Sequence, residues 1–181
     1  VAVGLQGDNL KFGFGSRGGW QPFGPVRKVT QAEGNILYKI DGEPALDIYK
    51  TYLGEKSKDL PASGLLYPFS IKSGDTDTHM IRTILGVDEE KGSLILAGEM
   101  QDGAQVQLMH TGSEGLVEGA ENAADLVKER DFDSESLAIM VSCVGRKNVM
   151  GEDVEDEVDA VKEKLGSNTI LSGFYSNGEI C

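Results

Sequence analysis

The segment SLAIMVSCVGRKNVMGEDVEDEVDAVKEKLGSNTILSGFY, residues 136–175, contains an apolar strand pattern, a helical pattern and a second strand pattern in succession. Two strands of one sheet that flank a helix form a right-handed crossover, so they run parallel as neighbours. Parallel sheets are usually covered on both sides. We therefore expect residues 137–143 and 169–175 to be parallel strands that are buried on both faces.

Apolar residues recur at helical spacing on both sides of the first of these strands. After it, the apolar positions are Val154, Val158, Val161 and Leu165, with Gly166 ending the helix. Before it, a capping-box spacing at Thr111 and Glu114 is followed by apolar positions at Leu116, Ala120, Ala123 and Val127. Both patterns predict helices that pack on the sheet.

The first 110 residues have a different pattern, in which short apolar runs alternate with turns. We expect strands at residues 1–5, 10–15, 26–31, 35–41, 65–71, 79–87, 93–99 and 104–110. The last four should follow one another as an antiparallel meander. One helix is predicted over residues 41–54, with Pro44 in its first turn and Gly54 at its end. The fold class is therefore mixed α/β (α+β), an antiparallel meander beside a parallel βαβ crossover with helices packed on the sheet.

The charge balance argues against one class of partner. The 181 residues include 17 Lys and Arg against 30 Asp and Glu, for a net charge of −13. Because nucleic-acid surfaces need clustered Lys and Arg, we expect no nucleic-acid partner. The two cysteines are too few for a disulfide framework, and no segment has the pattern of a signal peptide or a membrane span. These features predict a cytoplasmic protein without a membrane partner.

Polar side chains follow both strands of the predicted crossover. Cys143 and Arg146 follow the first strand, and Tyr175, Ser176 and Glu179 follow the second. Ligands in open α/β sheets gather outside the carboxyl ends of the strands. These residues are therefore candidates for one ligand site.

Cys143 has two interpretations. A catalytic thiol needs a base, usually His, to withdraw its proton, and neither His79 nor His110 has an adjacent Asp or Glu to orient it. A cysteine on an apolar strand commonly behaves as a small buried hydrophobe. We expect Cys143 to be the buried end of its strand, with a Cys143-dependent enzyme as the weaker alternative.

Arg146 also has two interpretations. A guanidinium offers forked donors to a carboxylate or a phosphate, so a loop that presents Arg146 could hold an anionic ligand. The helix that follows begins with acidic residues, however, and a structural ion pair with Glu152 or Asp153 is equally compatible with the sequence.

Trp20 is the single tryptophan and lies in a Gly- and Pro-rich loop between Arg17 and Phe23. An aromatic ring with an N–H donor beside a cation can form the wall of a small-ligand pocket. The same loop could instead plug the end of a sheet.

The two histidines raise the question of a cofactor. One neutral imidazole can hold haem iron, and the candidates are His110, which precedes a helix, and His79, which opens a strand. A zinc site would need further ligands at fixed spacing, which the sequence lacks. We expect no cofactor, with haem as the alternative.

Several phrases in order resemble one known family. They are GWQPFGPVRKVTQAEGNILYKIDGEPALDIYKTYLG, GSLILAGEMQDGAQVQL, SCVGR and GFYSNGEI. Together they resemble the C-terminal portion of a FIST domain over residues 19–179, while residues 1–18 resemble the tail of its N-terminal portion. We accordingly divide the chain into an N-terminal FIST tail, residues 1–29, and a FIST C-terminal domain, residues 30–181. The chain starts at Val1 without Met, so we expect a piece of a longer protein.

The resemblance implies an intracellular sensory module of a signal-transduction protein and no enzyme. FIST domains are thought to bind small molecules, with amino acids or their derivatives as a leading proposal, and to signal to histidine kinases, chemotaxis receptors or cyclic-dinucleotide enzymes. Members of similar fold bind haem and respond to nitric oxide, which makes a haem-based gas sensor the alternative function.

If the chain is such a small-ligand sensor, the polar residues at the strand ends and those in the family phrases are its candidate ligand contacts. Arg146 would pair with a ligand carboxylate, Trp20 or Tyr175 would pack against its apolar part, and Glu179 or Asp41 would hold an amine. The full set of candidate ligand-binding residues is Arg146, Trp20, Tyr175, Glu179, Cys143, Asp41, Ser176 and Arg17.

Overall fold

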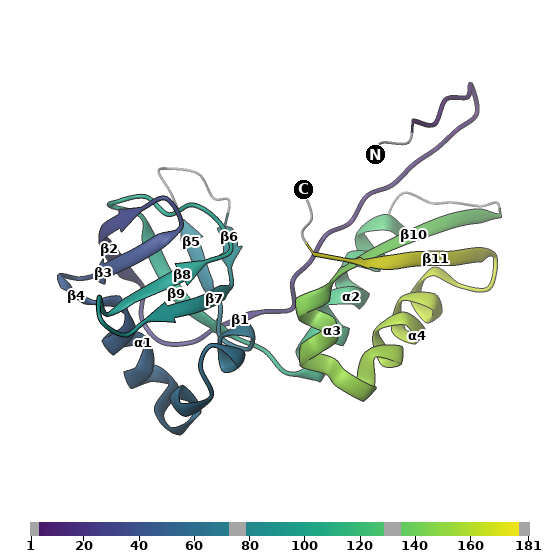
Figure 1. Cartoon of the computed structure of the whole chain (residues 1–181). Helices are drawn as coiled ribbons and strands as arrows, with labels where there is room; N and C mark the ends of the chain where they lie inside the picture. Colours follow the sequence, from purple (N-terminus) through teal and green to yellow (C-terminus); the bar gives the residue numbers. More distant parts are fainter. Residues whose placement is uncertain (1–3, 73–78, 129–134, 178–181) are drawn as a thin grey trace. The chain divides into compact units, whose positions relative to one another are not determined.

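The computed structural model describes residues 4–72, 79–128 and 135–177. The chain forms two compact units, which we call unit 1 (residues 1–19 and 113–181) and unit 2 (residues 20–112). Unit 2 contains an antiparallel sheet and unit 1 a parallel strand pair, each with helices (Figure 1). The predicted mixed α/β class is confirmed.

The sheet of unit 2 is antiparallel at every described pairing. Its strands are β1 (Gln21–Pro22), β2 (Arg27–Glu33), β3 (Ile36–Ile40), β4 (Glu43–Pro44), β5 (Phe69–Lys72), β6 (His79–Arg82), β7 (Ile84–Asp88), β8 (Ser93–Leu96) and β9 (Gln105–His110). Their order is β6-β5-β9-β2-β3-β8-β7, with β1 on β9 and β4 on β3.

Two of the strand predictions for the first 110 residues are wrong in detail. The last strand, β9, pairs with β5 and β2, whereas the meander pattern placed it beside β8. Residues 4–20 contain no strand, although residues 10–15 have a strand-like alternation. Pairing partners are chosen by the whole chain, so alternation alone does not show which partner is present.

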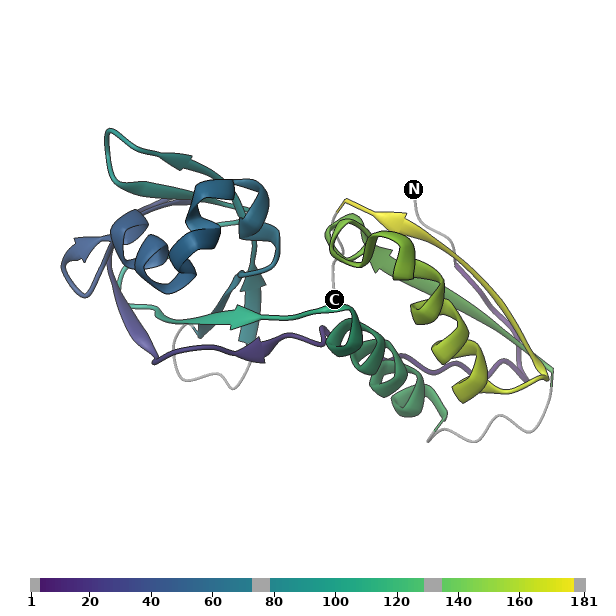
Figure 2. The same ribbon diagram turned by 90° about the horizontal axis from the view of Figure 1, so that it is seen from below.

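Helix α1 (Ala45–Leu53) covers the core of unit 2 and contacts β3 and β8 (Figures 1 and 2). Pro44 precedes it, and Gly54 ends it with a φ of 56°, a conformation that favours glycine. Leu46 and Tyr49 of the helix are fully buried against Leu37 and Leu94 of the sheet. Two 3₁₀ helices follow, η1 (Gly54–Asp59) and η2 (Ala62–Leu65).

Unit 1 contains the predicted crossover. Strands β10 (Ser136–Cys143) and β11 (Thr169–Ser176) are parallel, in a register that runs from Ser136 opposite Thr169 to Cys143 opposite Ser176. Helices α2 (Ser113–Lys128) and α4 (Val154–Leu165) pack together on one face of this pair (Figure 1). Their contacts with the strands place Ala120, Ala124 and Val161 against Met140 and Leu171.

The opposite face of β10 and β11 is exposed, so the prediction that both faces are buried is wrong for the described residues. Every second residue points away from the helices, and the large apolar side chains there are Leu137 (64% exposed), Ile139 (63%), Val141 (45%), Ile170 (70%) and Phe174 (62%). Helices α2 and α4 pack on the other side of the pair, and the large apolar side chains of this face stay exposed.

The loop predicted after Cys143 is a helix, α3 (Val144–Met150), which a 3₁₀ turn, η3 (Gly151–Asp153), joins to α4. Cys143 caps this helix, since its Sγ accepts a hydrogen bond from the Gly145 N–H at 3.2 Å. The burial of Arg146 and Met150 further stabilises the short helix.

The glycine-rich segment before unit 2 lies directly against the backbone of α2. A Cβ on Gly119 would lie 2.7 Å from the Cα of Gly19, and Cβ atoms on Gly15 or Gly19 would collide with the carbonyls of Ala123 and Gly115. Only glycine permits backbones to approach this closely. Gly15 and Gly19 therefore belong to a packing contact with α2.

Candidate functional site

The carboxyl ends of β10 and β11 lie side by side and bring several predicted residues together. Cys143 is opposite Ser176, and Ser142 is opposite Tyr175. Glu179, the remaining candidate at this edge, lies outside the described residues.

Arg146 is buried near this edge and binds protein groups. Its Nε and Nη2 donate to Glu157 Oε1 at 2.7 and 2.5 Å, its Nη1 donates to the Gly18 carbonyl at 2.6 Å, and its Nη2 also donates to the Leu116 carbonyl at 2.7 Å. Glu157 Oε2 accepts a further hydrogen bond from Ser142 Oγ at 3.0 Å. The ion pair that one interpretation placed with Glu152 or Asp153 is instead formed with Glu157, which lies in α4 while those two residues lie in η3. Arg146 of α3 is therefore hydrogen-bonded to the N-terminal segment, to α2 and to α4.

Tyr175 and Cys143 lie beside this buried ion pair. The Lys147 ammonium lies over the Tyr175 ring, 5.1 Å from its centroid. Burial, and then the negative charge of Glu157, raise the pKa of Tyr175 above its ordinary value, while Arg146 opposes the shift. The half-buried thiol of Cys143 serves as the helix cap described above.

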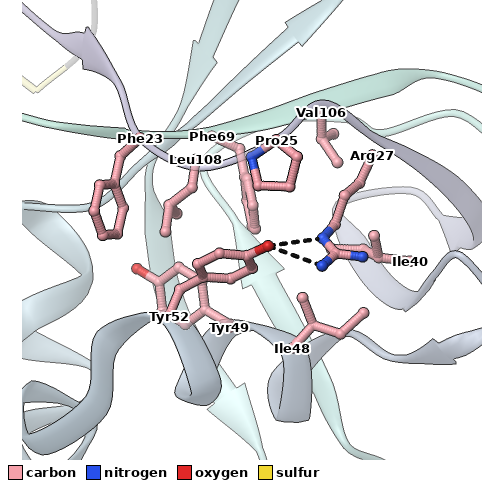
Figure 3. Close-up of a pocket in the computed structure, with 10 residues that line it drawn as sticks. All are labelled: Phe23, Pro25, Arg27, Ile40, Ile48, Tyr49, Tyr52, Phe69, Val106 and Leu108. Carbon is pink, nitrogen blue, oxygen red and sulfur yellow. Dashed lines mark hydrogen bonds between the residues drawn. The ribbon is translucent and has the colours of Figure 1, made fainter.

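A second cluster lies in unit 2, in a pocket between α1 and the sheet (Figure 3). The lining residues are Phe23, Pro25, Arg27, Ile40, Ile48, Tyr49, Tyr52, Phe69, Val106 and Leu108. Arg27 is the charged member of this otherwise apolar and aromatic lining. The enclosed space is about 10 Å³, room for one water molecule, so a larger ligand needs movement of the partly exposed Arg27 and Tyr52 side chains.

Tyr52 and Asp41 hold the Arg27 guanidinium in place. Nε and Nη2 donate to Tyr52 Oη at 3.2 and 2.8 Å (Figure 3), and Nη1 donates to Asp41 Oδ2 at 2.9 Å. The guanidinium carbon also lies 5.4 Å from the centroid of the Tyr52 ring. These contacts leave part of the guanidinium accessible, since the Arg27 side chain is 33% exposed.

Asp41 is the predicted residue that joins this cluster. It has a positive φ of 50°, and its Oδ1 accepts a hydrogen bond from the Lys28 N–H at 2.9 Å. This backbone hydrogen bond, and then the one from Arg27, lower the pKa of Asp41 below its ordinary value. The Tyr52 hydroxyl, and then Asp41, raise the pKa of Arg27. Asp41 and Arg27 thus form a cation–anion pair at the pocket.

Sequence reasoning missed Arg27, Tyr52 and the pocket role of Phe23. Arg27 and Tyr52 are 25 positions apart, so no local spacing signals their contact. The one available signal was the phrase GWQPFGPVRK, where an arginine follows an aromatic and proline-rich loop.

The other predicted residues are not among those that line the pocket, although His110 contacts one of its lining residues. Trp20 is half-buried at the start of unit 2, and the exposed Arg17 of unit 1 donates to the neighbouring Ser16 carbonyl at 2.9 Å. His110 ends β9, with its ring edge-on to Phe23 at a centroid distance of 5.6 Å, and His79 begins β6. Haem ligation by either histidine stays a prediction.

Two features are absent from the described residues. No group of three or more His, Cys, Asp or Glu side chains comes together there as a set of metal ligands. Within the same part of the chain, no helix combines the length and apolar character needed to cross a bilayer.

Comparisons with known proteins agree with the resemblance in the sequence. The family model described as FIST C domain matches residues 45–181, and the one described as FIST N domain matches residues 1–43. An uncharacterised protein of Methanocaldococcus jannaschii is 27% identical over 170 residues, which cover 86% of this chain and 32% of that protein. The chain thus spans about a third of the length of this curated relative. No solved structure matches. The chain belongs to the FIST family, whose domains are sensory domains of signal-transduction proteins.

Proposed function

We propose that this chain is the ligand-binding part of a cytoplasmic sensory domain, and that it binds a small molecule of the amino-acid type. It acts as a binding module and catalyses no reaction. The bound state is passed to a signalling partner such as a histidine kinase, a chemotaxis receptor or a cyclic-dinucleotide enzyme.

The observation that carries the proposal is the position of Arg27 and Asp41 beside an aromatic pocket. An amino acid has a carboxylate and an ammonium group on one carbon, and these charges complement a guanidinium and a carboxylate 2.9 Å apart. The apolar and aromatic walls, including Phe23 and Tyr52, suit an apolar ligand side chain. On this proposal Asp41 keeps the role of holding the amine, and Arg27 takes the carboxylate.

Arg27 is a better ligand contact than Arg146 because of its surroundings. Arg146 is 8% exposed and donates to Glu157 and to two backbone carbonyls, so a ligand would have to break a buried ion pair. Arg27 is partly exposed, and a ligand carboxylate can replace the Tyr52 hydroxyl as its acceptor. Rotation of the Tyr52 side chain would also open the pocket.

Titration calorimetry of the full chain against a panel of amino acids tests the proposal. We expect binding of an amino acid with an apolar side chain, and Arg27→Ala should weaken it by at least about tenfold, since a charge-assisted hydrogen bond contributes roughly 1.5–3 kcal/mol. Lys28→Ala is the matched control, because Lys28 is the neighbouring exposed cation on the same strand. Equal affinity of the wild type and Arg27→Ala would exclude this site, and no binding by any amino acid would exclude the ligand class.

A further inference from the structure

The Tyr52 hydroxyl occupies the edge of the Arg27 guanidinium that a ligand carboxylate would use. It accepts hydrogen bonds from Arg27 Nε and Nη2 at 3.2 and 2.8 Å (Figure 3), while Nη1 donates to Asp41. A carboxylate binds a guanidinium through the same kind of paired contact with two neighbouring nitrogens. A ligand carboxylate that binds this edge of Arg27 must therefore displace the Tyr52 hydroxyl.

The Tyr52 ring closes the pocket between Phe23 and Arg27 (Figure 3). The Phe23 ring lies edge-on to it at a centroid distance of 6.3 Å, and the Arg27 guanidinium carbon lies 5.4 Å from its centroid. Gly24 leaves room for the ring, since a Cβ at this position would lie 3.0 Å from Tyr52 Cε1. The enclosed space that remains is about 10 Å³. With Tyr52 in this position the pocket has room for one water molecule and for no amino acid.

The two tyrosines that α1 contributes to the pocket differ in how firmly they are held. Tyr49 is fully buried, and its hydroxyl donates to the Tyr67 carbonyl at 2.7 Å. Tyr52 is partly exposed, lies next to the last residue of the helix, and has its hydroxyl on an Arg27 side chain that is 33% exposed. Rotation of the Tyr52 side chain would therefore break contacts at the surface and leave the buried contacts of Tyr49 in place.

We propose that Tyr52 is an internal competitor of the ligand, whose contact with Arg27 keeps the pocket closed until a ligand carboxylate replaces it. The inference rests on the proposed function, because it concerns the regulation of the same site. A ligand binds only molecules in which Tyr52 has rotated away, so its apparent affinity is the affinity of the open pocket reduced by the fraction of open molecules. The contact between Tyr52 and Arg27 thus sets the ligand concentration at which the domain responds.

Tyr52→Phe distinguishes a competitor from a direct ligand contact, because it keeps the ring and removes only the hydroxyl. We expect an amino acid that binds the wild type to bind Tyr52→Phe about three- to tenfold more tightly in titration calorimetry, since a partly exposed hydrogen bond to a charge no longer stabilises the closed pocket. Tyr38→Phe removes a hydroxyl of unit 2 from a residue that does not line the pocket, and it should leave the affinity unchanged. Equal or weaker binding by Tyr52→Phe would overturn the proposal.

Chemical labelling of Arg27 tests the same contact without an amino acid. Phenylglyoxal condenses with accessible guanidinium groups, and mass spectrometry of the peptides measures the labelling rate of each arginine. Arg27 should react at least about twofold faster in Tyr52→Phe than in the wild type, because Nε and Nη2 lose their acceptor. The exposed Arg17 of unit 1 is the internal control and should react at the same rate in both proteins. Equal labelling of Arg27 in the two proteins would overturn the proposal.

The two measurements separate this inference from the proposed function. If no amino acid binds but Arg27 is labelled faster in Tyr52→Phe, the proposed ligand class is wrong and the closure of the pocket by Tyr52 stands. If an amino acid binds in a manner that depends on Arg27, while Tyr52→Phe changes neither the affinity nor the labelling, the proposed function stands and the competitor role of Tyr52 is wrong.

Discussion

Glu157 of α4 accepts two hydrogen bonds from Arg146 of α3 on a single carboxylate oxygen, at 2.7 and 2.5 Å. The two residues are 1% and 8% exposed, so both charges are almost completely removed from solvent. Because Arg146 also binds the carbonyls of Gly18 and Leu116, this one ion pair connects segments from both ends of the chain sequence.

Removal of either charge should therefore destabilise unit 1 strongly. Arg146→Ala or Glu157→Ala leaves a buried charge without its partner, and we expect a loss of about 3–5 kcal/mol in the free energy of unfolding, measured by urea denaturation. Lys164→Ala removes an exposed ion pair with Asp125 and should cost less than about 1 kcal/mol. Similar losses in Arg146→Ala and Lys164→Ala would contradict the structural role of Arg146.

Gly119→Ala should destabilise the chain, although alanine normally favours a helix over glycine by about 1 kcal/mol. The added Cβ would lie 2.7 Å from the backbone of Gly19, so the N-terminal segment must move away from α2. We expect a net loss of about 1–3 kcal/mol by thermal or urea unfolding. Gly112→Ala meets no atom within 4 Å and is the control. A stabilising Gly119→Ala substitution would show that the segment does not pack on α2.

The buried Tyr49 should make stability fall at high pH. Its hydroxyl donates to the Tyr67 carbonyl at 2.7 Å, and burial raises its pKa above the ordinary value of 10.0. Because the pKa of Tyr49 is higher in the folded state than in the unfolded state, the folded state favours the neutral phenol. The contribution of Tyr49 to the free energy of unfolding is therefore complete below about pH 10 and is lost as the pH rises further. Tyr49→Phe should cost about 0.5–1.5 kcal/mol at pH 7 and reduce the decline above pH 10, as measured by urea unfolding across pH. If the free energy of unfolding of the wild type and of Tyr49→Phe declines equally above pH 10, the decline does not come from Tyr49.

Cys143 should contribute to stability as the cap of α3. Cys143→Ser keeps a side-chain acceptor for the Gly145 N–H, whereas Cys143→Ala removes it and should cost about 0.5–2 kcal/mol. Thermal unfolding under reducing conditions measures the difference. If the alanine and serine variants have the same melting temperature, the thiol does not act as a cap.

Some elements of this fold follow from local sequence because their signals are local. Pro44 and Gly54 bracket an apolar helical stripe, and α1 forms between them. The strand, helix and strand patterns of residues 136–175 likewise predicted a parallel crossover, since the handedness and short connections of such units leave few alternatives. Helix α3 was missed because it is short, contains Gly145 and is stabilised by the buried contacts of Arg146 and Met150.

The site residues show the limit of local signals more clearly. The sequence singled out Asp41 but not Arg27, which donates to it from 14 positions away, nor Tyr52, which accepts a hydrogen bond from Arg27 and lies 25 positions from it. It also named Glu152 or Asp153 as the possible ion-pair partner of Arg146, whereas the partner is Glu157. Which carboxylate reaches the guanidinium depends on how α3 and α4 pack, and that packing involves the whole of unit 1.

By itself the sequence determined most of the segments that become strands and helices, because backbone preferences and side-chain periodicity act over a few residues. The exceptions are α3, which was expected to be a loop, and residues 10–15, which were expected to be a strand. Only the tertiary structure decided whether each apolar face is buried against another element or exposed. The run from Leu137 to Val141 predicts a strand in any context, yet its exposure depends on where α2 and α4 pack, and both lie on the side of Met140. Burial is a property of neighbours that are distant in sequence, so the exposed face of β10 and β11 could be recognised only in the folded chain.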